Sequence, residues 1–220
     1  MKTKILLCAF LAVPFLSAQT TLVGKVSVAG GAAPADTVVT INRIPDVATP
    51  SVGPRLISGA VSATLSVDSS GQFRSDSLPS GRYYICAYNG RPGFISNCEW
   101  TVPKPVTISG AASVVPCTVA LTMGSIVTIN VADPTGVMGQ GHRIRLGVMT
   151  DKGYYVQAKP AGSGGNGQYV VTIPSLATVR LFVDSDLTVA DAAGSVLQTR
   201  QPSSLVITGE SDTTVSLSVR

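Results

Sequence analysis

The stretch Asp68–Ala87, which reads DSSGQFRSDSLPSGRYYICA, decides the predicted fold. Ser70-Gly71 and Leu78–Gly81 are turn sequences on either side of the predicted short strand Gln72–Arg74. A second strand follows at Arg82–Ala87. Apolar or small residues alternate along it and therefore share one face of a sheet: Gly81, Tyr83, Ile85 and Ala87.

The same period of two continues along the chain and predicts a sheet protein throughout. We find no helical stripe of a dozen residues beyond the first eighteen residues. The alternating pairs and triplets are Val26/Val28, Val39/Ile41, Leu65/Val67, Val119/Leu121, Val127/Ile129/Val131, Ile144/Leu146/Val148, Val171/Ile173, Leu181/Val183, Leu205/Ile207 and Val215/Leu217/Val219. Many short strands separated by turn clusters are typical of an all-β sandwich, or of a pair of sandwiches.

Two domains fit this pattern best, with a boundary near Thr122–Ser125. Residues 19–122 form the first predicted sandwich and residues 123–220 the second. After the boundary, an apolar strand and the turn Asp133–Gly136 restart the pattern. Gly167–Val171 also resembles Gly81–Ile85, which favours a second, diverged sandwich. One large sandwich is the alternative.

The first eighteen residues have the layout of a secretory signal peptide. Lys2 and Lys4 precede the apolar run Ile5–Phe15, and Leu16–Ala18 ends in small residues. The run is shorter than the roughly 20 residues that span a bilayer. We expect cleavage after Ala18 and a secreted or periplasmic protein without a transmembrane segment. A buried N-terminal strand or an anchor is the alternative. We also expect the chain to end, without a sorting signal, in the strand Val215–Arg220.

Low charge argues against a nucleic-acid partner. Charged residues make up 13% of the chain, against about 25% in typical soluble proteins. The formal charge of +4 falls to +2 when Lys2 and Lys4 leave with the signal peptide. Such a balance gives no long-range field that would attract nucleic acid or an anionic membrane.

The order of turns and core positions in Asp68–Ala87 resembles carboxypeptidase regulatory-like domains, which are also called transthyretin-like or prealbumin-like sandwiches. The resemblance covers Leu22 to about Leu121. It implies an immunoglobulin-like antiparallel sandwich that serves as a non-catalytic accessory module. A related group of surface proteins carries Lys–Asn isopeptide bonds that need a nearby acid. Ala87 stands at the position of that acid, so we expect no isopeptide bond at Lys25.

Three cysteines remain in the mature chain: Cys86, Cys98 and Cys117. In an oxidising compartment, a hairpin-like return of the chain after Tyr88 would bring Cys86 close to Cys98. We therefore predict a Cys86–Cys98 disulfide and a buried, free Cys117. These cysteines and one distant histidine lack the spacing of a zinc site.

No motif in the sequence predicts catalysis, a cofactor or a metal. His142 is the single histidine, it lies in a glycine-rich turn, and no G-x-S-x-G motif supplies a nucleophile. Asp184, Asp186 and Asp191 lack the spacing of a calcium loop. Gly162–Gly167 lacks the Lys-Ser/Thr and the helix of a phosphate-binding loop.

Aromatic side chains are the remaining candidates for a binding surface, and we select Tyr88, Trp100 and Tyr154. The alternative is that these rings belong to the core. The sequence thus favours a secreted or periplasmic, non-catalytic binding or scaffolding protein of the cell envelope that acts through protein–protein contacts. A carbohydrate-binding module with a polysaccharide partner is the alternative, and a hydrolase is third.

Overall fold

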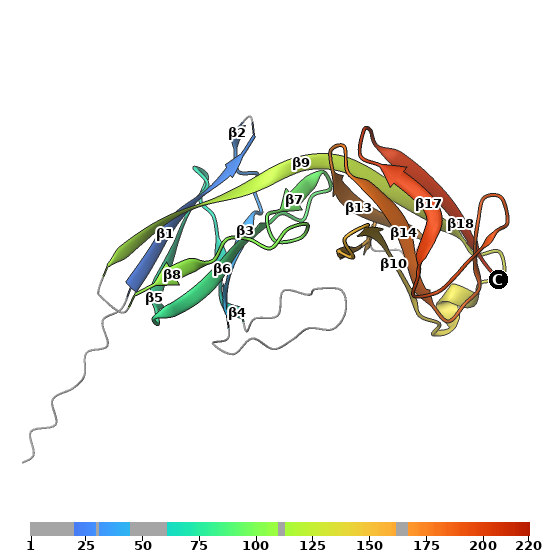
Figure 1. The fold of residues 1–220 in the computed structure, drawn as a ribbon, viewed down its shortest axis with the longest axis horizontal. Coiled ribbons are helices and arrows are strands. Elements are labelled where there is room, and N and C mark those ends of the chain that lie inside the picture. Colours follow the sequence, from blue (N-terminus) through green and yellow to red (C-terminus); the bar gives the residue numbers. More distant parts are fainter. Residues whose placement is uncertain (1–19, 30, 45–60, 110–112, 162–166) are drawn as a thin grey trace, which may run out of the picture.

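The computed structural model describes residues 20–29, 31–44, 61–109, 113–161 and 167–220. Within these ranges the chain consists of strands and turns, with one 3-10 turn at Val137–Gln140 and no α-helix (Figure 1). The predicted all-β class is confirmed. The predicted signal peptide and most of Gly162–Gly167 lie outside the described residues.

The first sandwich contains two packed sheets. Its strands are β1 (Thr20–Val28), β2 (Gly31–Ala32), β3 (Val38–Arg43), β4 (Val61–Ser66), β5 (Gln72–Leu78), β6 (Gly81–Tyr88), β7 (Phe94–Ser96), β8 (Val106–Ile108) and the first half of β9 (Val114–Ala132). One sheet has the order β4-β3-β6-β8. In the other, β1 lies between β9 and the strands β5 and β2, and β7 pairs with β9.

The second sandwich uses the other half of β9. Its further strands are β10 (Ile144–Thr150), β11 (Tyr155–Gln157), β12 (Lys159–Pro160), β13 (Gln168–Pro174), β14 (Thr178–Ser185), β15 (Val189–Asp191), β16 (Val196–Leu197), β17 (Pro202–Thr208) and β18 (Thr213–Val219). The two sheets have the orders β12-β13-β9-β18-β15-β16 and β11-β10-β14-β17.

Strand β9 passes through both sandwiches and forms the arch visible in Figure 1. It is 19 residues long. Its first half runs parallel to β1, and its second half pairs antiparallel with β13 and parallel with β18. Each sandwich therefore contains one parallel pair among its antiparallel neighbours. The segment 122–125, where we predicted a boundary, lies inside this strand.

The two sandwiches share the same strand order, which supports the prediction that the second is a diverged copy of the first. The orders β5-β1-β9 and β4-β3-β6-β8 in the first correspond to β13-β9-β18 and β11-β10-β14-β17 in the second. Every corresponding pair also has the same relative direction.

The sequence repeat differs from the predicted one. Gly167–Val171 opens β13, which corresponds to β5, whereas Gly81–Ile85 belongs to β6. The equivalent motifs are Gly71-Gln72-Phe73 and Gly167-Gln168-Tyr169. Both glycines have positive φ, 79° and 67°. Their carbonyls accept hydrogen bonds from the amides of Val26 at 2.8 Å and Val131 at 2.6 Å. A Cβ at either position would collide with the carbonyl oxygen of that valine, so the repeat requires glycine.

The Asp68–Ala87 stretch folds as its sequence predicts. The Asp68 carboxylate accepts hydrogen bonds from the Ser70 and Gln72 amides, each at 2.8 Å, and thereby closes the turn before β5. Hydrogen bonding to the Ser70 side chain and the Gln72 amide lowers the pKa of Asp68. In β6, the Tyr83 ring is fully buried and its hydroxyl donates to the Pro79 carbonyl at 2.9 Å.

Each sandwich has its own core, but the second core includes two side chains from the first half of the chain, Ile95 and Trp100. The first core contains no residue beyond Leu121. Its buried members are Leu22, Val26, Val39, Ile41, Phe73, Leu78, Tyr83, Ile85, Ala87, Ile108, Val119 and Leu121.

We propose on this basis that residues 19–122 are an independent domain and predict that this fragment folds alone. Its length of about 100 residues suits a single sandwich. A strand-rich circular dichroism spectrum and a cooperative urea transition are the expected results. A fragment that stays unfolded, while the full chain melts in one transition, would instead favour a single large unit.

Candidate functional site

The two sandwiches meet where β9 crosses from one to the other. The Gly93 amide donates to Thr172 Oγ1 at 3.0 Å, and the Gly124 amide donates to the Gly93 carbonyl at 3.0 Å. A Cβ on Gly124 would overlap the Ile173 carbonyl oxygen and Cδ1 of Ile95. Only glycine allows β7, β9 and β13 to come this close together.

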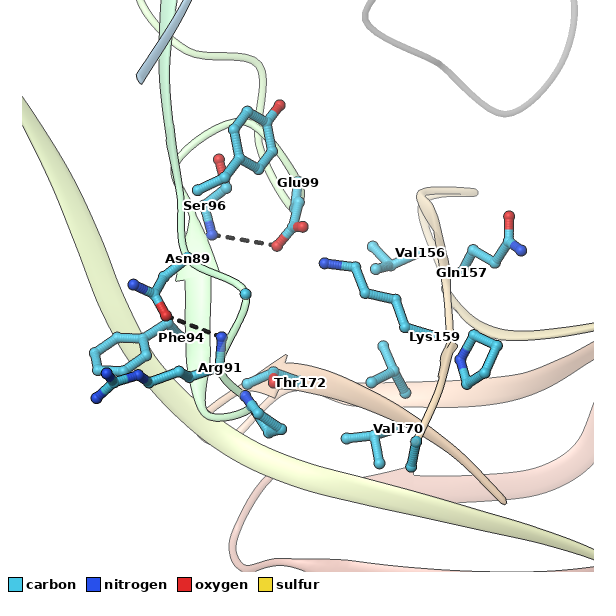
Figure 2. Close-up of a pocket in the computed structure, with 16 residues that line it drawn as sticks. Asn89, Arg91, Phe94, Ser96, Glu99, Val156, Gln157, Lys159, Val170 and Thr172 are labelled. Carbon is cyan, nitrogen blue, oxygen red and sulfur yellow. Dashed lines mark hydrogen bonds between the residues drawn. The ribbon is translucent and has the colours of Figure 1, made fainter. Parts of the chain in front are cut away.

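A cleft of about 280 Å³ opens beside this joint (Figure 2). One wall comes from the first sandwich and the other from β11, β12 and β13 of the second. The first wall consists of Tyr88, Asn89, Gly90, Arg91, Pro92, Phe94, Ser96 and Glu99; the second consists of Val156, Gln157, Lys159, Pro160, Ala161, Val170, Val171 and Thr172.

Asn89 holds the turn that forms the first wall. Its side chain is buried, and its Nδ2 donates to the Ala35 carbonyl at 3.1 Å and to Thr37 Oγ1 at 3.0 Å. Its Oδ1 accepts from the Arg91 amide at 2.9 Å. Because all of the amide's polar atoms are used within the protein, this turn is fixed before any ligand arrives. Arg91 lies at the rim, with Nη2 3.5 Å from Asp36 Oδ2.

Opposite charges project into the cleft from its two walls. Figure 2 shows the Glu99 carboxylate on one side and the Lys159 ammonium group reaching toward it from the other. Glu99 Oε2 accepts a hydrogen bond from the Ser96 amide at 3.2 Å, which sets the direction of that side chain. Apolar side chains also line the cleft, including Phe94, Val156 and Val170.

Tyr88 lies beside Glu99 as a neutral phenol. Burial raises the pKa of Tyr88; hydrogen bonding to Ser96 opposes this rise, and the negative charge of Glu99 adds to it. The hydroxyl therefore keeps its proton at neutral pH. The cleft thus offers a carboxylate, an ammonium group, a phenol and apolar surface, a combination suited to binding.

The predicted disulfide is present: Cys86 and Cys98 are bonded, with their Cα atoms 5.6 Å apart. The predicted hairpin is wrong, because β7 pairs with β9 and not with β6. The side chain of Asn97 instead attaches the Cys98 turn to the edge of β6. Its Oδ1 accepts from the Ala87 amide at 3.1 Å and its Nδ2 donates to the Ile85 carbonyl at 2.9 Å.

The structure does not bring the three predicted aromatic side chains together. Tyr88 lines the cleft. Trp100 must be corrected: it is only 8% exposed and packs in the second core, so its ring is not a free surface. Its Nε1 has no hydrogen-bond partner among the described residues. Tyr154 is half-buried in the β10–β11 turn, outside the cleft lining.

Glu99 and Lys159 were not predicted from the sequence. They lie 60 positions apart and line one cleft only because β9 continues from the first sandwich into the second. The turn-rich segment Asn89–Gly93 was a usable signal for the first wall. For the second wall, the one sequence signal was Pro160, because proline is typical of edge strands.

His142 and the aspartates Asp184, Asp186 and Asp191, which the sequence singled out, contact other side chains or close turns. His142 Nδ1 lies 3.8 Å from Asp186 Oδ2. Asp184 Oδ1 lies 2.9 Å from Arg200 Nε, and hydrogen bonding to Arg200 lowers the pKa of Asp184. Asp191 closes a turn by accepting from the Ala193 and Ser195 amides. Across the described ranges, we find no cluster of metal-ligating side chains.

Cys117 is free, as predicted, but it is partly rather than fully buried. Burial raises its pKa from 9.0 to about 11. Near pH 8 the thiolate fraction should fall about a hundredfold relative to the unfolded chain. We predict a comparable slowing of iodoacetamide alkylation in the native protein, measured by mass spectrometry with and without urea. Native and unfolded rates within about threefold of each other would contradict this.

No helix in the part of the chain that the structure describes is long and apolar enough to cross a membrane.

The chain matches no protein-family model and no curated protein. Among solved structures it is similar to the Bacillus anthracis TIE protein, with 12% identity and a TM-score of 0.35 over 92% of this chain and 34% of that one. A Streptococcal ancillary pilin gives 18% identity and a TM-score of 0.41 over 93% and 63%. The shaft pilin of Lactobacillus rhamnosus GG gives 9% and 0.36 over 92% and 98%.

The chain thus spans 34% of the first of these proteins and 63% of the second, less than two thirds of either length. Identities and TM-scores this low carry no statement about function. The resemblance of residues 22–121 to carboxypeptidase regulatory-like domains stays a prediction, whereas the β-sandwich architecture rests on the sheets themselves.

Proposed function

We propose that this protein is a secreted or periplasmic, non-catalytic protein of the cell envelope that binds a partner protein in the cleft between its two sandwiches. The Cys86–Cys98 disulfide supports the location, because such bonds persist in oxidising compartments. The leader-like first eighteen residues support it independently.

The facing charges of the cleft carry the proposal. Glu99 and Lys159 enter from opposite walls, and apolar side chains line the same cleft. A polypeptide segment that bears both signs of charge and apolar side chains complements such walls. Because the first wall is fixed by Asn89, binding requires little ordering of the protein, which favours affinity.

A carbohydrate-binding module is the second candidate. It is favoured by the rings of Tyr88 and Phe94, which line the cleft and could pack against the apolar face of a sugar. A hydrolase has less support, because Glu99 is the single carboxylate among the lining residues, which include no histidine or cysteine. General acid–base catalysis usually needs a second positioned group.

Site-specific photo-crosslinking in the host cells tests the proposal. Benzoylphenylalanine at position 88 reports on the cleft, and the same residue at position 84 is the matched control. Tyr84 and Tyr88 both belong to β6 and are half-buried, but Tyr84 does not line the cleft. We expect a discrete protein adduct from position 88 that is absent from position 84 and is reduced by Lys159→Ala.

Adducts of equal yield from both positions would contradict the proposal. A glycan array distinguishes the second candidate: binding of a neutral glycan that is lost in Tyr88→Ala would identify a carbohydrate-binding module instead.

A further inference from the structure

The outward face of the β11-β10-β14-β17 sheet carries an aromatic pair between arginines. The inward side chains of its central strands are buried, among them Leu146, Val148, Leu181 and Val183. Alternation therefore turns Arg145, Gly147 and Met149 of β10 outward, beside Asp184, Phe182 and Arg180 of β14. Both arginines are exposed.

The aromatic pair is held in place by a glycine. The rings of Tyr155 and Phe182 lie edge to face, with centroids 5.0 Å apart at an angle of 61°. The Tyr155 ring covers Gly147, where a Cβ would overlap it. Its hydroxyl donates to the Leu146 carbonyl at 3.4 Å. Both rings are partly exposed, so they form a fixed aromatic patch on this face.

Positive charge lies on both sides of this patch. In the register of β10 and β14, Arg145 lies opposite Asp184, Gly147 opposite Phe182, and Met149 opposite Arg180. The Cα atoms of positions 145 and 149 are thus about 14 Å apart along β10, with the aromatic row midway. Arg180 Nη1 donates to the Ser203 carbonyl at 3.3 Å.

Arginines outnumber carboxylates at this face. Asp184 Oδ1 lies 2.9 Å from Arg200 Nε and 3.5 Å from Arg143 Nη2. Asp186, at the end of β14, accepts from the Arg143 amide at 2.9 Å. Four arginines thus face two aspartates: Arg143, Arg145, Arg180 and Arg200 against Asp184 and Asp186. Arg145 and Arg180 have no ion-pair partner within the described residues.

We propose that this sheet face binds an acidic polysaccharide built of uronic-acid sugars. The apolar face of one sugar ring packs on Tyr155 and Phe182, and carboxylates of the chain reach Arg145 and Arg180 on either side. The excess positive charge supplies the complementarity. This site is separate from the cleft and does not depend on the function proposed for the cleft.

Isothermal titration of the full chain with polygalacturonate tests this proposal, with fully methyl-esterified polygalacturonate as the uncharged polymer of the same sugar. We expect binding of the acid form alone, weakening as salt rises. Arg145→Gln and Arg180→Gln should each weaken it at least about fivefold, as should Phe182→Ala. Arg74→Gln, at an exposed arginine of the first sandwich, is the matched control and should leave binding unchanged.

Several results would overturn the proposal: no binding of the acid form, equal binding of the ester, or equal weakening by Arg74→Gln. Equally tight binding of polyglutamate, unaffected by Phe182→Ala, would show a general anion surface that does not recognise sugar. Because the arginines are exposed, their substitution leaves the core intact, and circular dichroism checks the fold of Phe182→Ala.

Discussion

Gly124→Val is expected to lower the free energy of unfolding by about 3 kcal/mol. Any side chain at this position of β9 meets the Ile173 carbonyl oxygen on one side and the end of Ile95 on the other. Ile95 can rotate away, but the Ile173 oxygen belongs to the backbone of β13. The substitution must therefore move β13 or β7 away from β9. Urea denaturation followed by tryptophan fluorescence measures the loss.

The same substitution should also open the cleft, because Gly124 bonds to the Gly93 carbonyl at the base of the first wall. Gly31→Ala is the matched control: a Cβ there meets nothing within 4 Å, so its stability should stay within about 0.5 kcal/mol of wild type. A Gly124→Val protein as stable as Gly31→Ala would contradict the close packing of Gly124 against Ile173 and Ile95.

Removing the disulfide by the double substitution Cys86→Ala, Cys98→Ala is expected to cost about 3 kcal/mol of stability. The cysteines are 12 residues apart, and the entropy of closing a loop of this size corresponds to roughly that amount. The loop contains Asn89, the Gly90–Pro92 turn and β7. Loss of the disulfide therefore loosens the first wall of the cleft. Urea denaturation with and without dithiothreitol measures the effect.

Dithiothreitol should destabilise the wild-type protein and Cys117→Ala, but leave the double variant unchanged. Peptide mapping without reductant should recover Cys86 linked to Cys98. A linkage to Cys117, or equal sensitivity of all three proteins to reductant, would contradict this assignment.

Local sequence patterns predicted many of the longer strands, because alternate residues of these strands face the core. The Asp68 turn and the Cys86–Cys98 bond both depend on neighbours within about twenty positions. The error over Trp100 has a physical reason. A tryptophan in a loop after a disulfide has no periodicity, and its burial depends on a second sandwich that begins more than twenty residues later.

The cleft could not be predicted from local sequence patterns for a similar reason. Its walls come from positions 88–99 and 156–172, and their approach depends on the length and continuity of β9. The stretch from Leu121 through Ser125 reads as a possible boundary because Thr122, Met123 and Gly124 interrupt the alternation. In the structure, pairing with β7 and then with β13 carries the strand across that interruption.

We expect β9 to hold the two sandwiches in one fixed arrangement, so that the cleft between them keeps its shape. Double electron–electron resonance between spin labels at Arg74→Cys and Glu210→Cys, in a Cys117→Ala background, tests this most directly. Both positions are exposed, one in each sandwich. We predict one narrow distance distribution, which Gly124→Val broadens and Gly31→Ala leaves unchanged. A broad or two-peaked distribution in the otherwise unaltered chain would contradict the claim.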